Sequence, residues 1–487
     1  MKPVLIVLLS LMLFACGTKT SDMLELQNPI IPGYFADPSV VEFDGKYYLY
    51  ATADPWGGDF LSCWVSDDFQ NWTFNKLNWP TKAACTSPLS NSNNVWAPSV
   101  IRKGDSFYMY ISVGSEIWAG KASHPLGPWE NMPGDQPLVP FDTTRYTHEI
   151  DAEVFVDDDG KAYLYWGSGW GWINGRCWVA ELNSDMASFA TERKEITPER
   201  YFEGPWMIKH DGTYYLTYSE GKTIEDSYEV RYATSDSPFG PFTQAANSPI
   251  LTKDTSLQVY GPGHHTIVKL KDQHYILYHK HRLPFVSGTA YRQISMNPLY
   301  FDEKAKQIKN IVPELTVRIP KPGWSATSPL TSSKKQTVSN ETEAVLAGTS
   351  PYKHFQQDQL HPVSVSASTS AFDYTQPANV TDHHYGTLWQ PAPNDTAPEL
   401  IATFAAMQSS AIMELRLEYP WKRYYFIVDL SEDGTNWKQS ADFTKEGVEG
   451  SPVLVELKSR FKQIRVKFLQ RGDVVPAVWE WRFASLR

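Results

Sequence analysis

One short β-hairpin motif occurs five times along this chain, and no other feature of the sequence limits the fold as strongly. Its second strand is an aromatic run after a turn, found as FDGKYYLY at 43–50, KGDSFYMY at 103–110, DDGKAYLYW at 158–166, HDGTYYLTY at 210–218 and KDQHYILYH at 271–279. The turn positions 45, 104, 160, 212 and 273 are 59, 56, 52 and 61 residues apart. Another apolar run, such as DPSVVEF or APSVIRK, precedes each copy, so each unit opens with two strands joined by a tight turn.

Five units of roughly 50–60 residues, each long enough for four strands, predict a five-bladed β-propeller. Closing the ring leaves no long unpaired sheet edge. No sustained helical period interrupts the units, so the expected fold class is all-β. The alternative is a β-sandwich whose hairpins resemble one another by coincidence. At 487 residues the chain is too long for one ordinary core, which predicts a second domain.

Acidic residues recur near the start of the first strand of these hairpins. Counting back seven or eight residues from positions 44, 159, 211 and 272, each just before a turn position, gives Asp37, Asp151, Glu203 and His264. The second unit has Trp96 or Ala97 at this position. If the innermost strands follow the propeller axis, three carboxylates and a histidine gather at one mouth of the channel. Each alone could be a turn start, a strand cap or a solvated acid. Their shared position favours acid–base chemistry, with at least one raised pKa.

The charge balance limits the partners that the chain can bind. It has 44 Lys and Arg against 55 Asp and Glu, a net charge of −11. This balance disfavours nucleic acid and anionic membrane surfaces as partners. A neutral ligand fits it better than a phosphorylated one.

The N-terminus, MKPVLIVLLSLMLFACG, is predicted to be an export signal. The apolar run from Val4 to Phe14 is too short for a permanent membrane span. The sequence LFAC at 13–16 resembles the bacterial lipobox, so residues 1–15 are expected to be removed and Cys16 to carry lipid. An ordinary secretory signal is the alternative. We therefore expect an exported bacterial lipoprotein of the outer membrane or periplasm, in contact with the membrane only through this anchor.

Three further cysteines, Cys63, Cys85 and Cys177, follow the signal. An exported compartment permits a disulfide between Cys63 and Cys85. Three cysteines at these spacings form neither a disulfide framework nor a metal site. The fold is therefore not expected to depend on them.

Several ordered motifs within residues 28–320 resemble glycoside hydrolase family 43, whose members are five-bladed propellers. These motifs are NPIIPGYFADPSV, VWAPSVI, HEIDAEVFVDDDGKAYLYWG, YFEGPWMIK and GPGHHTIV. The resemblance implies an inverting glycosidase with Asp37 as the general base that activates water and Glu203 as the general acid. Asp151 would raise the pKa of Glu203 and hold it in place. An inverting enzyme keeps its two carboxyl groups roughly 6.5–9.5 Å apart, so that a water fits beneath the sugar.

Further site residues are implied by the same resemblance. His264, in GPGHH, matches a family histidine near the axis that is associated with bound calcium or water. The chemistry requires no cofactor, but a structural calcium near His264 is a candidate, with water completing its six to eight ligands. A hydrogen-bonded core histidine is the alternative. Arg292 resembles the family arginine that reaches the active centre to bind a sugar hydroxyl or the base; a surface arginine is the alternative.

Aromatic side chains are expected to wall the pocket, because sugar C–H faces stack well on aromatic rings. Trp96 and Trp206 are the preferred substrate-binding residues, since they lie in or beside motifs at the predicted channel mouth. Trp166, Trp170 and Trp172 are further candidates. Simple packing is the alternative for each of them.

The last third of the chain has a different character. Residues 321–361 are rich in Ser and Thr without a sustained period and predict a linker or a crossing segment. Short alternating strands in residues 362–487 predict a β-sandwich. ANVTDHHYGTLWQ and VDLSEDGTNW resemble the discoidin-like (coagulation-factor C-type) jelly roll, a carbohydrate-binding module in many bacterial glycosidases. Trp389 is expected to belong to its packing, and the domain either tethers substrate or only buttresses the propeller.

The leading functional hypothesis is an exo-acting, inverting α-L-arabinofuranosidase on a neutral plant-type glycan. β-Xylosidases, endo-arabinanases and galactan-degrading relatives share the fold and the three carboxylates, and pocket shape separates them. A non-catalytic glycan-binding lipoprotein is the alternative of another class. The complete set of acid, base and modulating carboxylate favours the enzyme. The sequence does not indicate an oligomeric state.

Overall fold

The computed structural model describes residues 23–81, 83–85, 94–132, 134–142, 144, 147–321, 355, 358–471 and 474–486. Regular structure in this part of the chain is almost entirely β-strand, which confirms the all-β prediction. The predicted signal, Cys16 and most of the predicted linker lie outside the described residues, so lipidation stays a prediction. No helix in the described ranges has the length and apolar character needed to cross a membrane.

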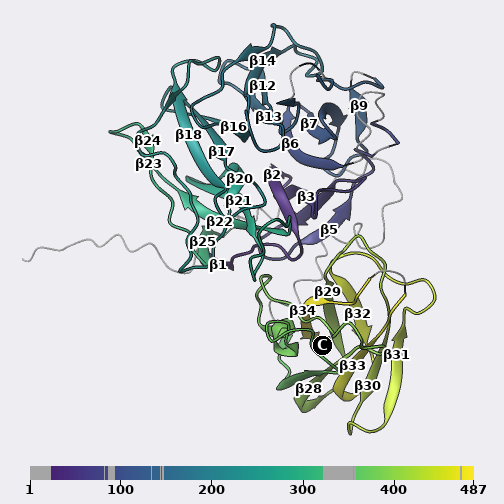
Figure 1. The fold of residues 1–487 in the computed structure, drawn as a ribbon. Helices are drawn as coiled ribbons and strands as arrows, with labels where there is room; N and C mark the ends of the chain where they lie inside the picture. Colours follow the sequence, from purple (N-terminus) through teal and green to yellow (C-terminus); the bar gives the residue numbers. More distant parts are fainter. Residues whose placement is uncertain are drawn as a thin grey trace, which may run out of the picture.

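Five antiparallel sheets form the N-terminal unit (Figure 1). Sheet one contains β2 (Phe35–Phe43), β3 (Lys46–Ala53), β4 (Ser62–Ser66) and β5 (Thr73–Lys76). Sheet two contains β6 (Val95–Lys103), β7 (Ser106–Val113), β8 (Glu116–Ala122) and β9 (Glu130–Met132). Sheet three contains β11 (Glu153–Val156), β12 (Ala162–Trp166), β14 (Trp178–Leu182) and β15 (Lys194–Glu195). Sheet four contains β16 (Glu203–His210), β17 (Thr213–Glu220), β18 (Glu229–Ser235) and β19 (Thr243–Gln244). Sheet five contains β20 (Gly263–Leu270), β21 (Gln273–His281) and β22 (Arg292–Leu299).

The first strands of these sheets form a closed ring. β2, β6, β11, β16 and β20 lie next to one another in sequence order, and β20 in turn lies next to β2. The architecture is therefore the predicted five-bladed propeller. β1 (Met23–Gln27) pairs antiparallel with β25 (Thr316–Pro320), which ties the start of the unit to its end. Two small additional pairs are β10 (Thr147–His148) with β13 (Ser168–Gly169), and β23 (Phe301–Asp302) with β24 (Gln307–Ile308).

Apolar side chains of the repeated strands fill the space between neighbouring blades. Tyr50 of blade one and Met109 of blade two share one buried cluster. Leu49 faces the other way and packs with Leu277 of blade five. Because successive residues of a strand point to opposite faces, each blade is apolar on both sides and packs against both neighbours. This is why the repeated strands are continuous aromatic and aliphatic runs.

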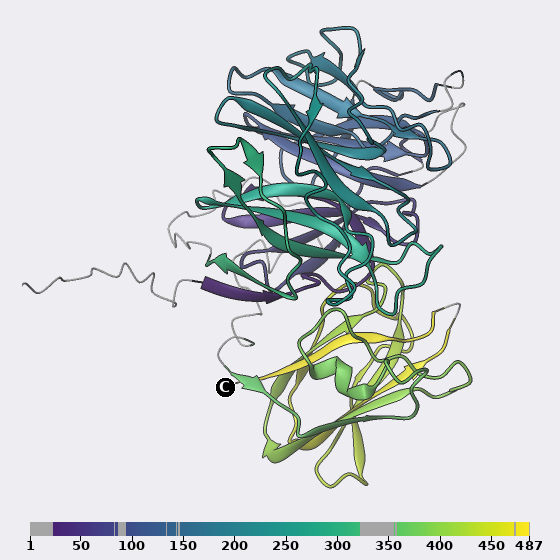
Figure 2. The same ribbon diagram turned by 60° about the vertical axis from the view of Figure 1, so that its left-hand side comes forward.

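The C-terminal unit consists of two antiparallel sheets (Figure 2). The first contains β26 (Gln359–Leu360), β34 (Val478–Ser485), β29 (Ala411–Leu417) and β32 (Val453–Leu457). The second contains β27 (Ser364–Ala367), β28 (Glu399–Gln408), β33 (Phe461–Leu469), β30 (Tyr425–Ser431) and β31 (Trp437–Asp442). A 3-10 helix, Pro377–Thr381, precedes β28. Trp389 is fully buried in the shared core, and its indole donates to the carbonyl of Thr369 at 2.9 Å.

Buried charges join the C-terminal unit to blade one. Arg416 on β29 bonds the Glu414 carboxylate at 2.7 Å and donates to the carbonyl of Trp72 at 2.8 Å. Arg482 on β34 bonds the same carboxylate at 2.6 Å and donates to the side-chain oxygen of Asn71 at 3.1 Å. Arg416 and Glu414 are fully buried, so removing one of them would strand a charge away from water. These contacts hold the two units together.

Cys63, Cys85 and Cys177 are free thiols buried in the propeller. A disulfide between Cys63 and Cys85, which the sequence permitted, is therefore absent. Both side chains instead pack in the apolar cluster between blades one and two. Burial raises the pKa of the Cys85 thiol to about 12, so it has little tendency to react as a thiolate.

We expect a reducing agent to leave the thermal unfolding midpoint of the protein unchanged, because no disulfide supports the propeller. A native disulfide would contribute about 2–4 kcal/mol. Calorimetry with and without dithiothreitol measures this. Thiol titration before and after denaturation is the control, and the three propeller cysteines should react only after unfolding. A lower midpoint in dithiothreitol would contradict the structure.

Candidate active site

A residue in the left-handed backbone region lies within two residues of the start of the innermost strand in every blade. These residues are Asp37 (φ 53°), Ala97 (φ 50°), Asp151 (φ 59°), Gly204 (φ 59°) and His264 (φ 37°). Strand pairing shifts register at this point in blades one, two, four and five, so each residue is part of a β-bulge. A bulge redirects the side chain and bends the strand. The shared conformation brings Asp37, Asp151 and His264 to one end of the propeller axis.

The bulge also corrects two details of the sequence alignment. Glu203 lies one residue before the shared position, which Gly204 occupies in blade four. The equivalent residue of blade two is Ala97 and not Trp96. The shared position lies eight residues before the turn glycine in blade one (Asp37 and Gly45) and in blade four (Gly204 and Gly212), whereas Glu203 lies nine residues before Gly212. Glu203 still lines the cavity with Asp37 and Asp151.

A second ring of polar residues supports the first, and the sequence analysis missed it. Its members lie six residues after the first residue of the second strand in each blade. They are, from blade one to blade five, Thr52, Ser112, Ser168, Ser219 and His279. All five are buried. The hydroxyls of Ser112 and Ser219 accept the N–H groups of Asp151 and His264, at 3.0 and 2.9 Å. Aligning the five repeats for polar residues in an otherwise apolar strand would have revealed this ring.

Asp37 accepts three hydrogen bonds that keep it ionised. Thr52 donates to one oxygen at 2.7 Å, and His279 and Arg292 bond the other at 3.0 and 3.1 Å. A carboxylate can only accept, so the Nδ1 of His279 carries the proton. Burial by itself would raise the pKa of Asp37, but Arg292, His264 and His279 together hold it well below its usual range. Asp37 is therefore an ionised carboxylate at neutral and mildly acidic pH.

Arg292 is buried and oriented by a second acid. It forms a bidentate pair with Asp54, at 2.9 Å from Nε and 2.7 Å from Nη2. Its remaining Nη1 reaches Asp37. The prediction that Arg292 reaches the active centre agrees with this placement, and the contact is with the carboxylate predicted to be the base. Bidentate pairing fixes the planar guanidinium in one orientation.

Glu203 has the opposite electrostatic environment. Burial raises its pKa to about 7, although hydrogen bonds from Tyr228 at 2.8 Å and Ser168 at 2.9 Å act in the other direction. The pKa of Asp151 is raised well above its usual range, first by burial and then by the charge of Glu203. The family resemblance assigned the raised pKa of Glu203 to repulsion by Asp151, whereas burial is the largest cause and the charge that adds to it is that of Asp37. One cavity thus holds an ionised carboxylate and a protonated carboxyl group, as acid–base catalysis requires.

His264 lies between the two aspartates. Its Nδ1 is 3.4 Å from Asp37 and 3.7 Å from Asp151, and burial lowers its pKa, so the imidazole is neutral. Among the described residues, one group has three acidic or histidine ligand atoms within 4.8 Å of one another, as a metal ion would need. This group is His210, Asp211 and Glu303 on the surface, and it does not include His264. A calcium ion at His264 would therefore take most of its ligands from water.

The cavity over these residues has a volume of about 330 Å³. Trp56, Trp96, Trp172 and His148 form its aromatic wall. Trp96 is held by a hydrogen bond from its indole to the carbonyl of Gly114 at 2.9 Å. Trp170 stacks on His148 with ring centroids 4.2 Å apart and is 49% exposed.

Two of the predicted aromatic residues lie elsewhere. Trp206 does not line the cavity, because β16 continues past the bulge and turns this side chain into the apolar cluster between blades four and five. Trp166 is buried between blades two and three, and its indole donates to Glu149 at 2.6 Å. His265, the neighbour of His264 on β20, bonds the Thr217 hydroxyl at 2.7 Å, so its side chain lies on the opposite face of the strand.

We expect Gly204→Ala to lower kcat/KM about 100-fold, as small displacements of catalytic groups do. A Cβ at this position would lie 3.2 Å from the His264 ring and would push it against the aspartates. The backbone strain of the substitution adds about 1–3 kcal/mol of destabilisation. The matched control is Gly212→Ala, at a turn of the same blade with φ +75° and no atom within 4 Å of the added Cβ. Equal activity of the two variants would contradict the role of this close approach.

The pH profile provides a second test. We expect kcat/KM to fall above about pH 7, where Glu203 loses its proton, and to stay high well below it because Asp37 remains ionised. Ser168→Ala removes a donor that favours the ionised form of Glu203, so the pKa should rise and the basic limb should move to higher pH. Ser62→Ala, a buried serine of β4 bonded to the Ala51 carbonyl, is the control. A basic limb that stays in place or moves to lower pH would contradict this assignment.

Comparison with known proteins places this geometry in a family. The chain is 37% identical over 307 residues to a β-D-galactofuranosidase of Aspergillus niger, covering 59% of this chain and 85% of that protein. It is 28% identical over 333 residues to a xylosidase/arabinosidase of Bacteroides ovatus, covering 57% and 96%. An arabinoxylan arabinofuranohydrolase of Bacillus subtilis is 28% identical over 332 residues, with coverage of 58% and 64%.

Solved structures agree. One described as a glycoside hydrolase matches 94% of this chain and 99% of its own with a TM-score of 0.74 at 26% identity, so the match includes both units. A thermostable family-43 glycoside hydrolase matches 62% of this chain and all of its own, with a TM-score of 0.50 and 27% identity. The sequence profile of "Glycosyl hydrolases family 43" matches residues 26–305, which contain the whole site. The chain therefore belongs to glycosyl hydrolase family 43 and is a glycoside hydrolase.

Proposed function

We propose that the protein is an exo-acting, inverting α-L-arabinofuranosidase on arabinoxylan-type glycans, with Asp37 as base and Glu203 as acid. The observation that carries this proposal is the electrostatic contrast between the two residues across one cavity. Asp37 is held ionised by Arg292 and His279, and Glu203 has a pKa of about 7. A glycosidase that inverts its substrate in one step needs this combination of ionised base and protonated acid.

The roles follow from the contacts of each residue. Asp37 takes a proton from a water that attacks the anomeric carbon, and Glu203 gives its proton to the leaving oxygen. The bond from that carbon to the leaving oxygen breaks as the bond to water forms. Asp151 lies 3.7 Å from the His264 Nδ1, and burial together with the charge of Glu203 raises its pKa, which favours its neutral form beside the acid. Arg292 and His279 act as positioning residues for the base.

The substrate proposal draws on the relatives and on the cavity. Relatives named xylosidase/arabinosidase and arabinoxylan arabinofuranohydrolase support a pentose at the cleaved end. A cavity of about 330 Å³ is at the small end of ligand sites, which favours one or two sugar units and therefore exo action. β-D-Galactofuranoside cleavage is the second candidate, favoured by the 37% identical galactofuranosidase. Both candidates are furanosides, which differ in the group beyond the ring.

Two further proposals concern the rest of the chain. The two-sheet core and the buried Trp389 support a discoidin-like assignment of residues 362–487, with a role in holding glycan near the propeller. The lipobox-like sequence supports export and lipid anchoring at Cys16.

We expect wild-type protein to hydrolyse p-nitrophenyl α-L-arabinofuranoside faster than the β-D-galactofuranoside or the β-D-xylopyranoside. NMR of the first-formed sugar should show the inverted anomer. Asp37→Asn should lower kcat by about 10²–10⁴-fold on all active substrates. Glu203→Gln should lower it less on p-nitrophenyl glycosides than on arabinoxylan oligosaccharides, because p-nitrophenolate leaves with little protonation.

Other outcomes have definite meanings. Faster cleavage of the galactofuranoside would replace the arabinofuranosidase proposal with the second candidate. A retained anomer would contradict the mechanism. Binding of glycans without cleavage of any, in wild-type protein, would identify a binding protein and reject the enzyme proposal.

A further inference from the structure

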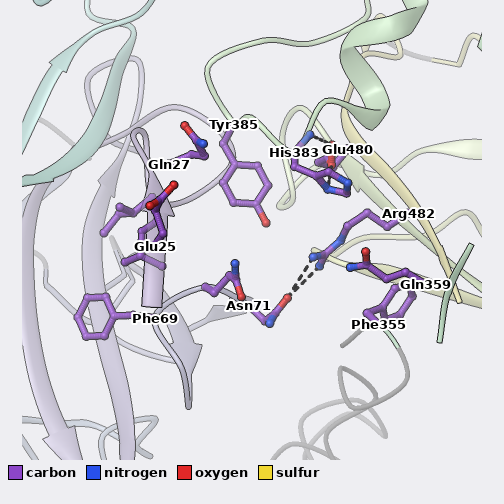
Figure 3. A pocket seen from close by; sticks show the side chains of 13 residues that line it. Glu25, Gln27, Phe69, Asn71, Phe355, Gln359, His383, Tyr385, Glu480 and Arg482 are labelled. Carbon is purple, nitrogen blue, oxygen red and sulfur yellow. Dashed lines mark hydrogen bonds and ion pairs between the residues drawn. The ribbon is translucent and has the colours of Figure 1, made fainter. Parts of the chain in front are cut away.

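A second cavity lies where the propeller meets the C-terminal unit (Figure 3). Its volume is about 470 Å³, and it shares no lining residue with the cavity over Asp37 and Glu203. One wall comes from β1 and blade one, and the other from β26, β34 and the loop before β28. We call it the interdomain crevice, and its lining includes the polar residues Asn71, Gln359, His383, Tyr385, Glu480 and Arg482.

Rigid contacts shape the crevice, so it is a built feature and not a gap between loosely placed units. Arg482 donates to Asn71 across the interface at 3.1 Å and pairs with the buried Glu414 at 2.6 Å. The ring of Tyr385 lies under the Arg416 guanidinium, 5.6 Å from its centre. The side-chain amide of Gln293 in blade five donates to the Tyr385 carbonyl at 2.8 Å. These contacts fix both walls and the aromatic ring between them.

Polar groups of the crevice remain open to a ligand. The Tyr385 hydroxyl points into the space between β1 and Arg482 (Figure 3). The carboxyl group of Glu480 lines the crevice and is 1% exposed. Its Oε1 accepts the His383 backbone N–H at 2.9 Å, and its Oε2 lies 3.7 Å from the His383 Nδ1 without a hydrogen-bond partner among the described residues. A buried polar atom without a partner is costly unless a ligand or water bonds it.

The charge of the crevice favours a neutral ligand. Burial raises the pKa of Glu480 to about 8, so this group is mostly protonated at neutral pH and can donate. Arg482 shares the buried carboxylate of Glu414 with Arg416, and the exposed carboxylate of Glu25 pairs with Arg318 at 3.4 Å. The charged groups at the crevice therefore already have ionic partners. The remaining groups are hydroxyl and amide, which offer donors and acceptors in equal measure beside an aromatic ring. This combination matches a sugar.

We propose that the interdomain crevice is a second, non-catalytic binding site for a neutral glycan chain, formed jointly by the propeller and the C-terminal unit. The proposal rests on the proposed function for the choice of glycan. A chain held there keeps its other residues at high local concentration around the enzyme. Because both units supply the walls, the site exists only when they are docked. This gives the C-terminal unit a role in binding that depends on its contact with the propeller.

The test uses the full chain with Glu203→Gln, so that glycan is bound and not consumed. The crevice is filled by adding Gln359→Trp, whose indole enters from the edge strand β26. The matched control is Gln439→Trp, at an exposed position of β31 outside the crevice. Calorimetric titration with a neutral arabinoxylan oligosaccharide measures stoichiometry and affinity. We expect two oligosaccharides per chain in the parent and control proteins and one in the filled variant.

A milder variant guards against misfolding of the filled one. Tyr385→Phe removes only the hydroxyl and should weaken the second binding event about tenfold, with the first unchanged. One oligosaccharide per chain in the parent protein, or two in the filled variant, would overturn the inference. So would an equal effect of Gln359→Trp and Gln439→Trp.

The two proposals can fail separately. Aryl glycoside cleavage by wild-type protein with a single binding event in the Glu203→Gln parent rejects the crevice and keeps the enzyme. No cleavage of any glycoside, with a binding event that Gln359→Trp removes, keeps the crevice and rejects the proposed activity. The same titration with a uronic-acid-bearing oligosaccharide tests whether the crevice prefers a neutral glycan. Tighter binding of the acidic oligosaccharide than of the neutral one would overturn that preference.

Discussion

The left-handed backbone residue near the start of each innermost strand is the constraint on which the active site depends. Closing five blades into a ring brings five strand ends to one place, and this conformation brings Asp37, Asp151 and His264 to one end of the axis. Each non-glycine residue in the left-handed backbone region lowers the stability of the folded chain by about 1–2 kcal/mol. Asp37, Asp151 and His264 adopt it nevertheless, and the second-strand ring bonds their backbone or side chains. Strain in the first ring is thus balanced by hydrogen bonds from the second.

Two carboxyl groups in one cavity reach opposite protonation states because their partners differ. Asp37 has a guanidinium, an imidazole N–H and a hydroxyl directed at it. Glu203 has only two hydroxyl donors, from Tyr228 and Ser168, and these are too weak to offset burial. Desolvation by itself would protonate both groups, so the position of Arg292 decides which is the base. Asp54 fixes Arg292 in that position by a bidentate pair.

The C-terminal unit is attached to the propeller through charge as well as apolar packing. Two arginines converge on the buried Glu414 and continue to the backbone and side chains of blade one. Trp479 adds an edge contact to Tyr34, with ring centroids 5.2 Å apart. Buried charges demand well-defined partners, so this interface fixes the orientation of the two units. A solved glycoside hydrolase that matches 94% of the chain has a corresponding arrangement of both units. The shape of the interdomain crevice follows from this docking.

The repeats by themselves determined the blade number, the all-β class and the residues Asp37, Asp151 and His264, because a period of two and a regular turn are local properties of a chain. Three other results required the tertiary structure. Glu203 lies one residue off the shared position, since a bulge changes register without leaving a mark in composition. Trp206 packs between blades four and five, since the same bulge decides which face its side chain takes. Cys63 and Cys85 stay unpaired within one apolar cluster. The contrast between the pKa values of Asp37 and Glu203 also appears only in the folded chain. Burial produces it together with the guanidinium of Arg292, which lies more than 250 residues from Asp37 in sequence but 3.1 Å away in space.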